Sequence, residues 1–138
     1  MNFMLIGGPA DSEWGTILRH ALAPLGEVTY LPSSSWHDNF GEKLFEVVII
    51  DASNVDGVEQ FVRLAHTEQP SSKIVVVTAS PTWQRARAAF YAGATDYIPK
   101  ILNEQVLQNA FKKLLDKPQI HSARGWTGGR AWNEKESH

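Results

Sequence analysis

The sequence predicts an α/β domain built on a single doubly wound, five-stranded parallel sheet. Five short apolar runs follow one another along the chain, and the segments between most of them carry the spacing of amphipathic helices. Two runs, 46–51 and 73–78, are apolar at nearly every position, as parallel strands covered on both faces are. Right-handed crossovers then favour the strand order 2-1-3-4-5 in a three-layer sandwich.

Length and composition limit the other possibilities. The 138 residues, of which 43% are hydrophobic, suffice for one domain with one core. A net charge of -2 gives no basic excess, which disfavours direct binding to nucleic acid or to an anionic membrane. The chain has no cysteine, and its apolar runs are far shorter than the roughly 20 residues that span a bilayer. We therefore expect a cytoplasmic protein.

The first half of the chain supplies three strands and two clear helices. The first helix begins at Asp11 or Ser12, either of which can accept hydrogen bonds from free backbone N–H groups. The segment 33–45 leaves room only for a short or irregular second helix. A third helix spans about 56–68 and ends before Pro70. The five strands are expected at residues 2–6, 27–31, 46–51, 73–78 and 96–99. The first helix places its apolar residues on one stripe: Trp14, Ile17, Leu18, Ala21, Leu22 and Leu25.

The second half supplies two more helices and a tail. The fourth helix spans about 81–92, with Pro81 in its first turn and Gly93 at its C-terminal cap. The fifth begins after Asn103, ends before Pro118 and is expected to bury Val106, Ala110 and Leu114. We place the domain at residues 1–117 and a flexible tail at 118–138, where Gly, Ser and charged residues show no apolar periodicity. Two tryptophans in the tail, Trp126 and Trp132, leave docking onto a partner or onto the domain as the alternative.

Three polar residues each follow an apolar run: Asp51 in VVIID, Thr78 in IVVVT and Lys100 in DYIPK. Because parallel strands end at the same edge of a sheet, we expect these side chains to converge on one crevice. An acid, a hydroxyl and an amine placed together suggest phosphoryl capture, in which Asp51 accepts the group and the other two bind its oxygens. The alternative is that each residue has only an ordinary structural role at the end of its strand.

These residues resemble the receiver domain of two-component response regulators, over about residues 2–115. The resemblance depends on Asp51, on Thr78 followed by Ala79, and on the segment AGATDYIPK that leads into Lys100. It implies a flavodoxin-like or CheY-like fold in which Asp51 is the phosphoacceptor and Thr78 and Lys100 coordinate the phosphoryl group. It also implies that Tyr97 is a switch residue and that the chain is a signalling phosphoprotein, not an enzyme.

The chain departs from this family where a metal would bind. The family's adjacent acids after the first strand correspond to Gly7 and Gly8. The remaining candidates for holding Mg²⁺ are Asp51, Asp11 and the carbonyl of Ser53. Because Mg²⁺ is usually anchored by one or two carboxylates among about six oxygens, we expect it to bind weakly or not at all.

The family resemblance also implies an output surface, formed by the fourth helix, the fifth strand and the fifth helix. On it we place Trp83, Arg87 and Phe111. More apolar surface than one sheet contact needs, with arginine beside it, is typical of an interaction surface. Its partners would be proteins, such as a histidine kinase, a downstream effector or a second copy in a homodimer. The alternative is that the fifth helix simply has a wide core face.

Three functions remain open from the sequence. The first is an atypical receiver module that signals by protein contact with weak or absent phosphorylation. The second is a conventional receiver that a histidine kinase phosphorylates at Asp51 with Mg²⁺. The third is a small flavodoxin-like nucleotide-binding protein or enzyme that uses Gly7 and Gly8, although no G-x-G-x-x-G or GK[ST] motif is complete.

Overall fold

The computed structural model describes residues 1–7, 12–32, 43–53 and 55–116 of the chain. Five strands form one parallel sheet in the order β2-β1-β3-β4-β5, which confirms the predicted fold class. Each strand lies within one residue of its predicted position. The strands are β1 (Asn2–Ile6), β2 (Glu27–Leu31), β3 (Val47–Asp51), β4 (Lys73–Thr78) and β5 (Asp96–Pro99).

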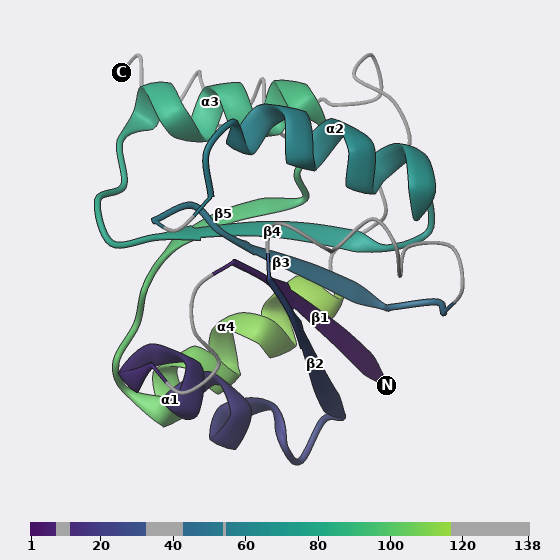
Figure 1. The fold of residues 1–138 in the computed structure, drawn as a ribbon. Coiled ribbons are helices and arrows are strands. Elements are labelled where there is room, and N and C mark those ends of the chain that lie inside the picture. Colours follow the sequence, from purple (N-terminus) through teal and green to yellow (C-terminus); the bar gives the residue numbers. More distant parts are fainter. Residues whose placement is uncertain (8–11, 33–42, 54, 117–138) are drawn as a thin grey trace.

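Helices cover both faces of the sheet, with α2 and α3 on one side and α1 and α4 on the other (Figure 1). In the described part of the chain, none of the helices is both long and apolar enough to span a membrane. The predicted fourth and fifth helices are α3 and α4, while the short second helix expected in 33–45 falls mostly outside the described residues. The helices are α1 (Glu13–Leu22), α2 (Val58–Glu68), α3 (Trp83–Ala92) and α4 (Glu104–Asp116).

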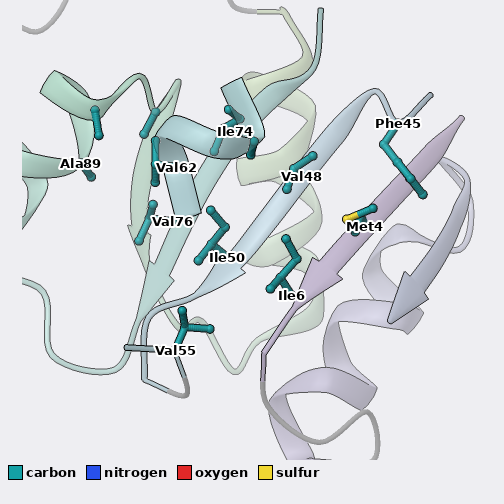
Figure 2. Close-up of a cluster of buried hydrophobic side chains, with 13 residues drawn as sticks. Met4, Ile6, Phe45, Val48, Ile50, Val55, Val62, Ile74, Val76 and Ala89 are labelled. Carbon is teal, nitrogen blue, oxygen red and sulfur yellow. The ribbon is translucent and has the colours of Figure 1, made fainter. Parts of the chain in front are cut away.

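Successive residues of the central strands point to opposite faces, because side chains alternate along a strand. Figure 2 shows the layer on the α2 and α3 side, which contains Met4, Ile6, Val48, Ile50, Ile74 and Val76 from the strands. The opposite layer, against α1 and α4, contains Phe3, Leu5, Val47, Ile49, Val75 and Val77. All these side chains are buried, as predicted for strands covered on both faces. The sheet is therefore packed on both faces, and the ends of its parallel strands lie at one edge.

Two helix starts are set by hydroxyl caps. Ser12 accepts the backbone N–H of Gly15 at 3.0 Å and begins α1, while the other candidate, Asp11, lies outside the described residues. Thr82 accepts the N–H of Arg85 at 3.2 Å and begins α3. The prediction that Pro81 lies in the first helical turn is therefore wrong, since it precedes the cap.

The buried face of α4 also differs from the predicted one. Val106 was expected in the core but is 50% exposed, and Ala110 is only partly buried. Leu107 and Phe111 are fully buried instead, and Leu114 is buried as expected. Two apolar rows on this helix each repeat every four residues, so spacing alone does not decide which row faces the sheet.

Phe111 is consequently a core residue, and its predicted place on an interaction surface is wrong. Its ring packs edge to face against Phe3 of β1, with centroids 6.3 Å apart and planes at 84°. The helix start helps to fix this rotation, because the Asn103 side chain accepts the N–H of Val106 at 3.0 Å. The larger side chains then fill the space over the sheet.

Candidate functional site

Asp51 and Lys100 meet at the carboxyl edge of the sheet. Asp51 is the last residue of β3 and Lys100 follows β5, so β4 lies between their strands. The Lys100 Nζ is 3.0 Å from Asp51 Oδ2, and the two side chains are 18% and 6% exposed. A charge-assisted contact at this distance in a largely buried place is a strong, directional interaction.

The loop after β3 engages the other oxygen of the carboxylate. The Ser53 N–H donates to Asp51 Oδ1 at 3.0 Å, and the Ser53 hydroxyl accepts the N–H of Ala79 at 3.3 Å. Ser53 thus contacts Asp51 through its amide and the end of β4 through its hydroxyl. Both carboxylate oxygens of Asp51 therefore have partners already.

Thr78 ends β4 at the same edge and is 4% exposed. Its carbonyl accepts the N–H of Lys100 at 2.9 Å, which extends the ladder beyond β5 and fixes the lysine backbone. Its hydroxyl accepts the N–H of Ser80 at 3.1 Å within its own loop. The structure therefore brings Thr78 to the crevice, with its hydroxyl turned to a local hydrogen bond.

Gly7 follows β1 at the carboxyl edge of the sheet. Its φ is +95°, a conformation that favours glycine. A Cβ added to Gly7 would lie 2.6 Å from Val55 Cγ2 and 3.3 Å from the Asp51 carbonyl oxygen. Val55 is buried and lies on the loop that follows β3, in the same layer as Ile6 and Ile50 (Figure 2). An apolar methyl group thus fills the space that a side chain at position 7 would need.

The predicted metal ligands are only partly within the described residues. Asp51 and Ser53 are adjacent through the Ser53 amide, whereas Asp11 lies outside the part of the chain that the structure describes. Among the described residues, no three His, Cys, Asp or Glu side chains gather into a group that could hold a metal. The described site thus supplies one carboxylate. Mg²⁺ is usually held by oxygen ligands that include one or two carboxylates.

Tyr97 lies on β5 and packs against the α2 and α3 side of the core. Its hydroxyl is buried and has no hydrogen-bond partner among the described residues. Tyr97 does not contact the Asp51–Lys100 pair in any interaction that we find in the described residues.

Trp14 is a site neighbour that the sequence assigned only to the core stripe of the first helix. It is 5% exposed, and the Lys100 Nζ lies 5.6 Å from the centroid of its indole ring. Helical spacing places Trp14 on the buried face, yet it contains no signal for a contact with a residue 86 positions later. Only the three-dimensional arrangement of α1 and β5 brings them together.

The exposed face of α3 carries a ridge of large side chains. Trp83 and Tyr91 are 46% and 50% exposed, and Arg87 between them is also exposed. The Arg87 guanidinium lies 5.4 Å from the Tyr91 ring centroid. Sequence reasoning identified Trp83 and Arg87 but missed Tyr91, which the four-residue spacing of the three could have revealed.

Comparison with known proteins identifies the fold of this chain. No protein-family model matches the sequence, and no curated protein matches it significantly. A response regulator from Thermotoga maritima is similar in structure, with a TM-score of 0.74 and 19% identity over 84% of this chain and 98% of that one. The likeness is one of fold, and this chain has the CheY-like receiver fold.

Two further solved structures differ in what is known of their regulation. One is an atypical orphan response regulator with a phosphorylation-independent regulatory mechanism, at TM-score 0.70 and 20% identity over 86% of this chain and 98% of that one. The other is a response regulator from Burkholderia pseudomallei with a phosphorylated aspartic acid, a calcium ion and citrate. It matches at TM-score 0.63 and 19% identity, over 99% of this chain and 86% of that one. The same fold therefore occurs in a regulator with a phosphorylation-independent mechanism and in one that holds a phosphorylated aspartic acid.

Proposed function

We propose that this chain is an atypical receiver module of two-component signal transduction, which signals by protein contact with weak or absent phosphorylation of Asp51. The CheY-like fold and the Asp51–Lys100 pair at its carboxyl edge support the receiver part of the proposal. A solved relative in fold has a phosphorylation-independent mechanism, so the fold is compatible with such regulation. In this module, a partner protein that prefers one of two states sets the output.

The observation that carries the proposal is the filled space beside Gly7. An ideal Cβ there would lie 2.6 Å from a Val55 methyl group, so an acidic side chain has no room at the position where the family holds its metal. A bound metal commonly contributes several kcal/mol to phosphoryl transfer. Losing about 3 kcal/mol of that slows the reaction about a hundredfold. Asp51 would then keep its place in the pocket while losing most of its reactivity.

The ridge of Trp83, Arg87 and Tyr91 on α3 supports the output part of the proposal. Its members are exposed, large and partly apolar, as residues of protein interfaces tend to be. Trp, Tyr and Arg are also the residue types that most often dominate binding energy at interfaces. We assign the partner contact to this ridge, with a histidine kinase, an effector or a second copy of the chain as its partner.

Intact-mass spectrometry after incubation with acetyl phosphate and Mg²⁺ tests the proposal. The expected result is that the wild type gains no phosphoryl mass. Its spectrum should therefore equal that of Asp51→Asn, the control that lacks the acceptor. A phosphorylatable receiver treated in parallel verifies the donor. A clear gain in the wild type that Asp51→Asn abolishes would overturn the proposal.

That same outcome would favour the conventional alternative, in which a histidine kinase phosphorylates Asp51 with Mg²⁺. The Asp51–Lys100 contact at 3.0 Å is the observation in its favour, because Lys100 is placed to neutralise a phosphoryl oxygen. Asp11, which this alternative would recruit as a second carboxylate, lies outside the described residues. An Asp11→Asn variant in the mass assay determines whether it takes part.

A further inference from the structure

Lys100 is approached by two groups from different parts of the chain. Its Nζ lies 3.0 Å from Asp51 Oδ2 and 5.6 Å from the centre of the Trp14 ring, with 18% of the side chain exposed. We propose that Trp14 is a positioning residue, whose indole face holds the Lys100 ammonium group beside Asp51. The inference rests on the proposed function only in taking Lys100 as a member of the site.

The physical argument begins with the flexibility of lysine. Its four-carbon side chain loses about 2 kcal/mol of rotamer freedom when it is fixed, and a carboxylate at one end is a single anchor. An ammonium within about 6 Å of an aromatic centroid is attracted by the negative face of the ring, and tryptophan gives the strongest attraction. The attraction increases when the cation is withdrawn from water, as Lys100 largely is. Trp14 therefore supplies a second anchor.

Packing in the core holds the Trp14 ring. Trp14 lies in the first turn of α1, within the buried layer between the sheet and the α1–α4 pair. It is 5% exposed, so its ring is surrounded by other side chains of this layer. Ile98 and Ile101, on either side of Lys100 in the chain, pack against the same layer.

This arrangement connects α1 to the crevice. The charge of Asp51 and the face of Trp14 are two separate anchors of Lys100. Because the ring contact does not involve the carboxylate, Trp14 keeps the lysine in place when the carboxylate is neutralised. That independence is the property that separates a positioning role from simple filling of the core.

Proton NMR of the wild type provides the first test. An ammonium group above an indole face places its neighbouring methylene protons in the shielding region of the ring. We expect the Lys100 ε-methylene signal, identified by its loss in Lys100→Arg, upfield of those of the exposed Lys112 and Lys113. A Lys100 signal at the same position as these two signals would overturn the inference. Because this test uses the wild type, it does not disturb the core.

Variants then separate the two anchors. Asp51→Asn should retain the upfield shift, Trp14→Phe should retain most of it, and Trp14→Leu should abolish it. Loss of the shift in Asp51→Asn would show that the carboxylate alone holds the lysine and would overturn the inference. The matched control is Trp83→Leu on the exposed face of α3, which should leave the Lys100 signal unchanged.

A double-mutant cycle measures the strength of the contact. Trp14→Leu and Lys100→Met should together change the unfolding equilibrium constant by about threefold less than the product of their separate effects. Effects that simply multiply would overturn the inference. The outcome is independent of the mass assay, since phosphorylation of Asp51 would overturn the proposed function and leave the ring shift in place.

Discussion

At the amino edge of the sheet, buried polar groups bind one another in a neutral network, whereas at the carboxyl edge they form a charged and partly open pair. At the amino edge Gln69 is 1% exposed, accepts the N–H of Phe45 at 3.2 Å and donates to the Lys43 carbonyl at 2.9 Å. The Ser72 hydroxyl contacts both Gln69 Oε1 and the Phe45 carbonyl. Every polar group of this network is paired with a near neighbour.

The carboxyl edge differs in charge and in access. Asp51 and Lys100 have opposite charges, and the lysine remains 18% exposed at the rim. Charges in a partly desolvated place cost more to hold than neutral hydrogen bonds, unless they are paired as Asp51 and Lys100 are. The amino edge therefore holds its strand ends by neutral hydrogen bonds, whereas the carboxyl edge holds a pair of opposite charges whose burial costs stability if either partner is lost.

Replacing Gln69 should have the largest effect on stability. Gln69→Ala leaves the Phe45 N–H, the Lys43 carbonyl and the Ser72 hydroxyl without this partner and opens a cavity. We expect a loss of about 3 kcal/mol in the free energy of unfolding, measured by urea denaturation. The matched control is Gln105→Ala on the exposed face of α4, which should change it by less than about 0.5 kcal/mol. A small effect of Gln69→Ala would remove the distinction between the two edges.

Breaking the charged pair should have the next largest effect. Lys100→Met leaves a largely buried carboxylate without its cation, and we expect a loss of about 2 kcal/mol. Asp51→Asn should destabilise less, because an amide oxygen still accepts the Ser53 N–H and Lys100 keeps its contact with Trp14. The double variant should lose less unfolding free energy than the sum of the two single losses, since no unpaired charge remains. Simple addition of the two effects would show that the pair is not coupled.

The sequence predicted the fold well because its evidence is local. Alternation and apolar runs depend on neighbouring residues, so all five strands were predicted within one residue of their bounds. The burial of β3 and β4 on both faces was also predicted. The start of α1 and the end of α3 also lie where the sequence predicts them, with Ser12 and Gly93 as caps. The rotation of α4 was not predictable in this way, since two rows with equal spacing competed for the core.

The site was only partly predictable for a related reason. Parallel strands that end at one edge predict that Asp51 and Lys100 approach each other, and the structure places them 3.0 Å apart. The contacts of Val55 with Gly7 and of Trp14 with Lys100 join residues from different loops and helices. They depend on loop paths and side-chain directions, which no spacing in one sequence specifies. The sequence could therefore identify the glycine at position 7 but could not show that Val55 lies beside it.

The turn at Gly7 offers a smaller and more local test of the carboxyl edge. Gly7→Ala places a Cβ against Val55 in a backbone conformation that L residues rarely adopt. We expect a loss of about 1–2 kcal/mol in the free energy of unfolding. In a Val55→Ala background the loss should fall but not vanish, because the strain at φ +95° remains. An unchanged cost would show that Val55 does not limit a side chain at position 7.

The exposed ridge on α3 should show the smallest effect on stability and the clearest effect on association. Trp83→Ala should change the free energy of unfolding by less than about 0.5 kcal/mol, because the side chain lies at the surface. If the ridge carries a homodimer contact, the same change should weaken self-association about tenfold, as truncation of an interface tryptophan commonly does. Sedimentation at increasing concentration measures this, with the exposed Leu44→Ala at the amino edge as the control. Equal loss in both variants would contradict the assignment of the contact to α3, and a wild type that stays monomeric would exclude the homodimer contact.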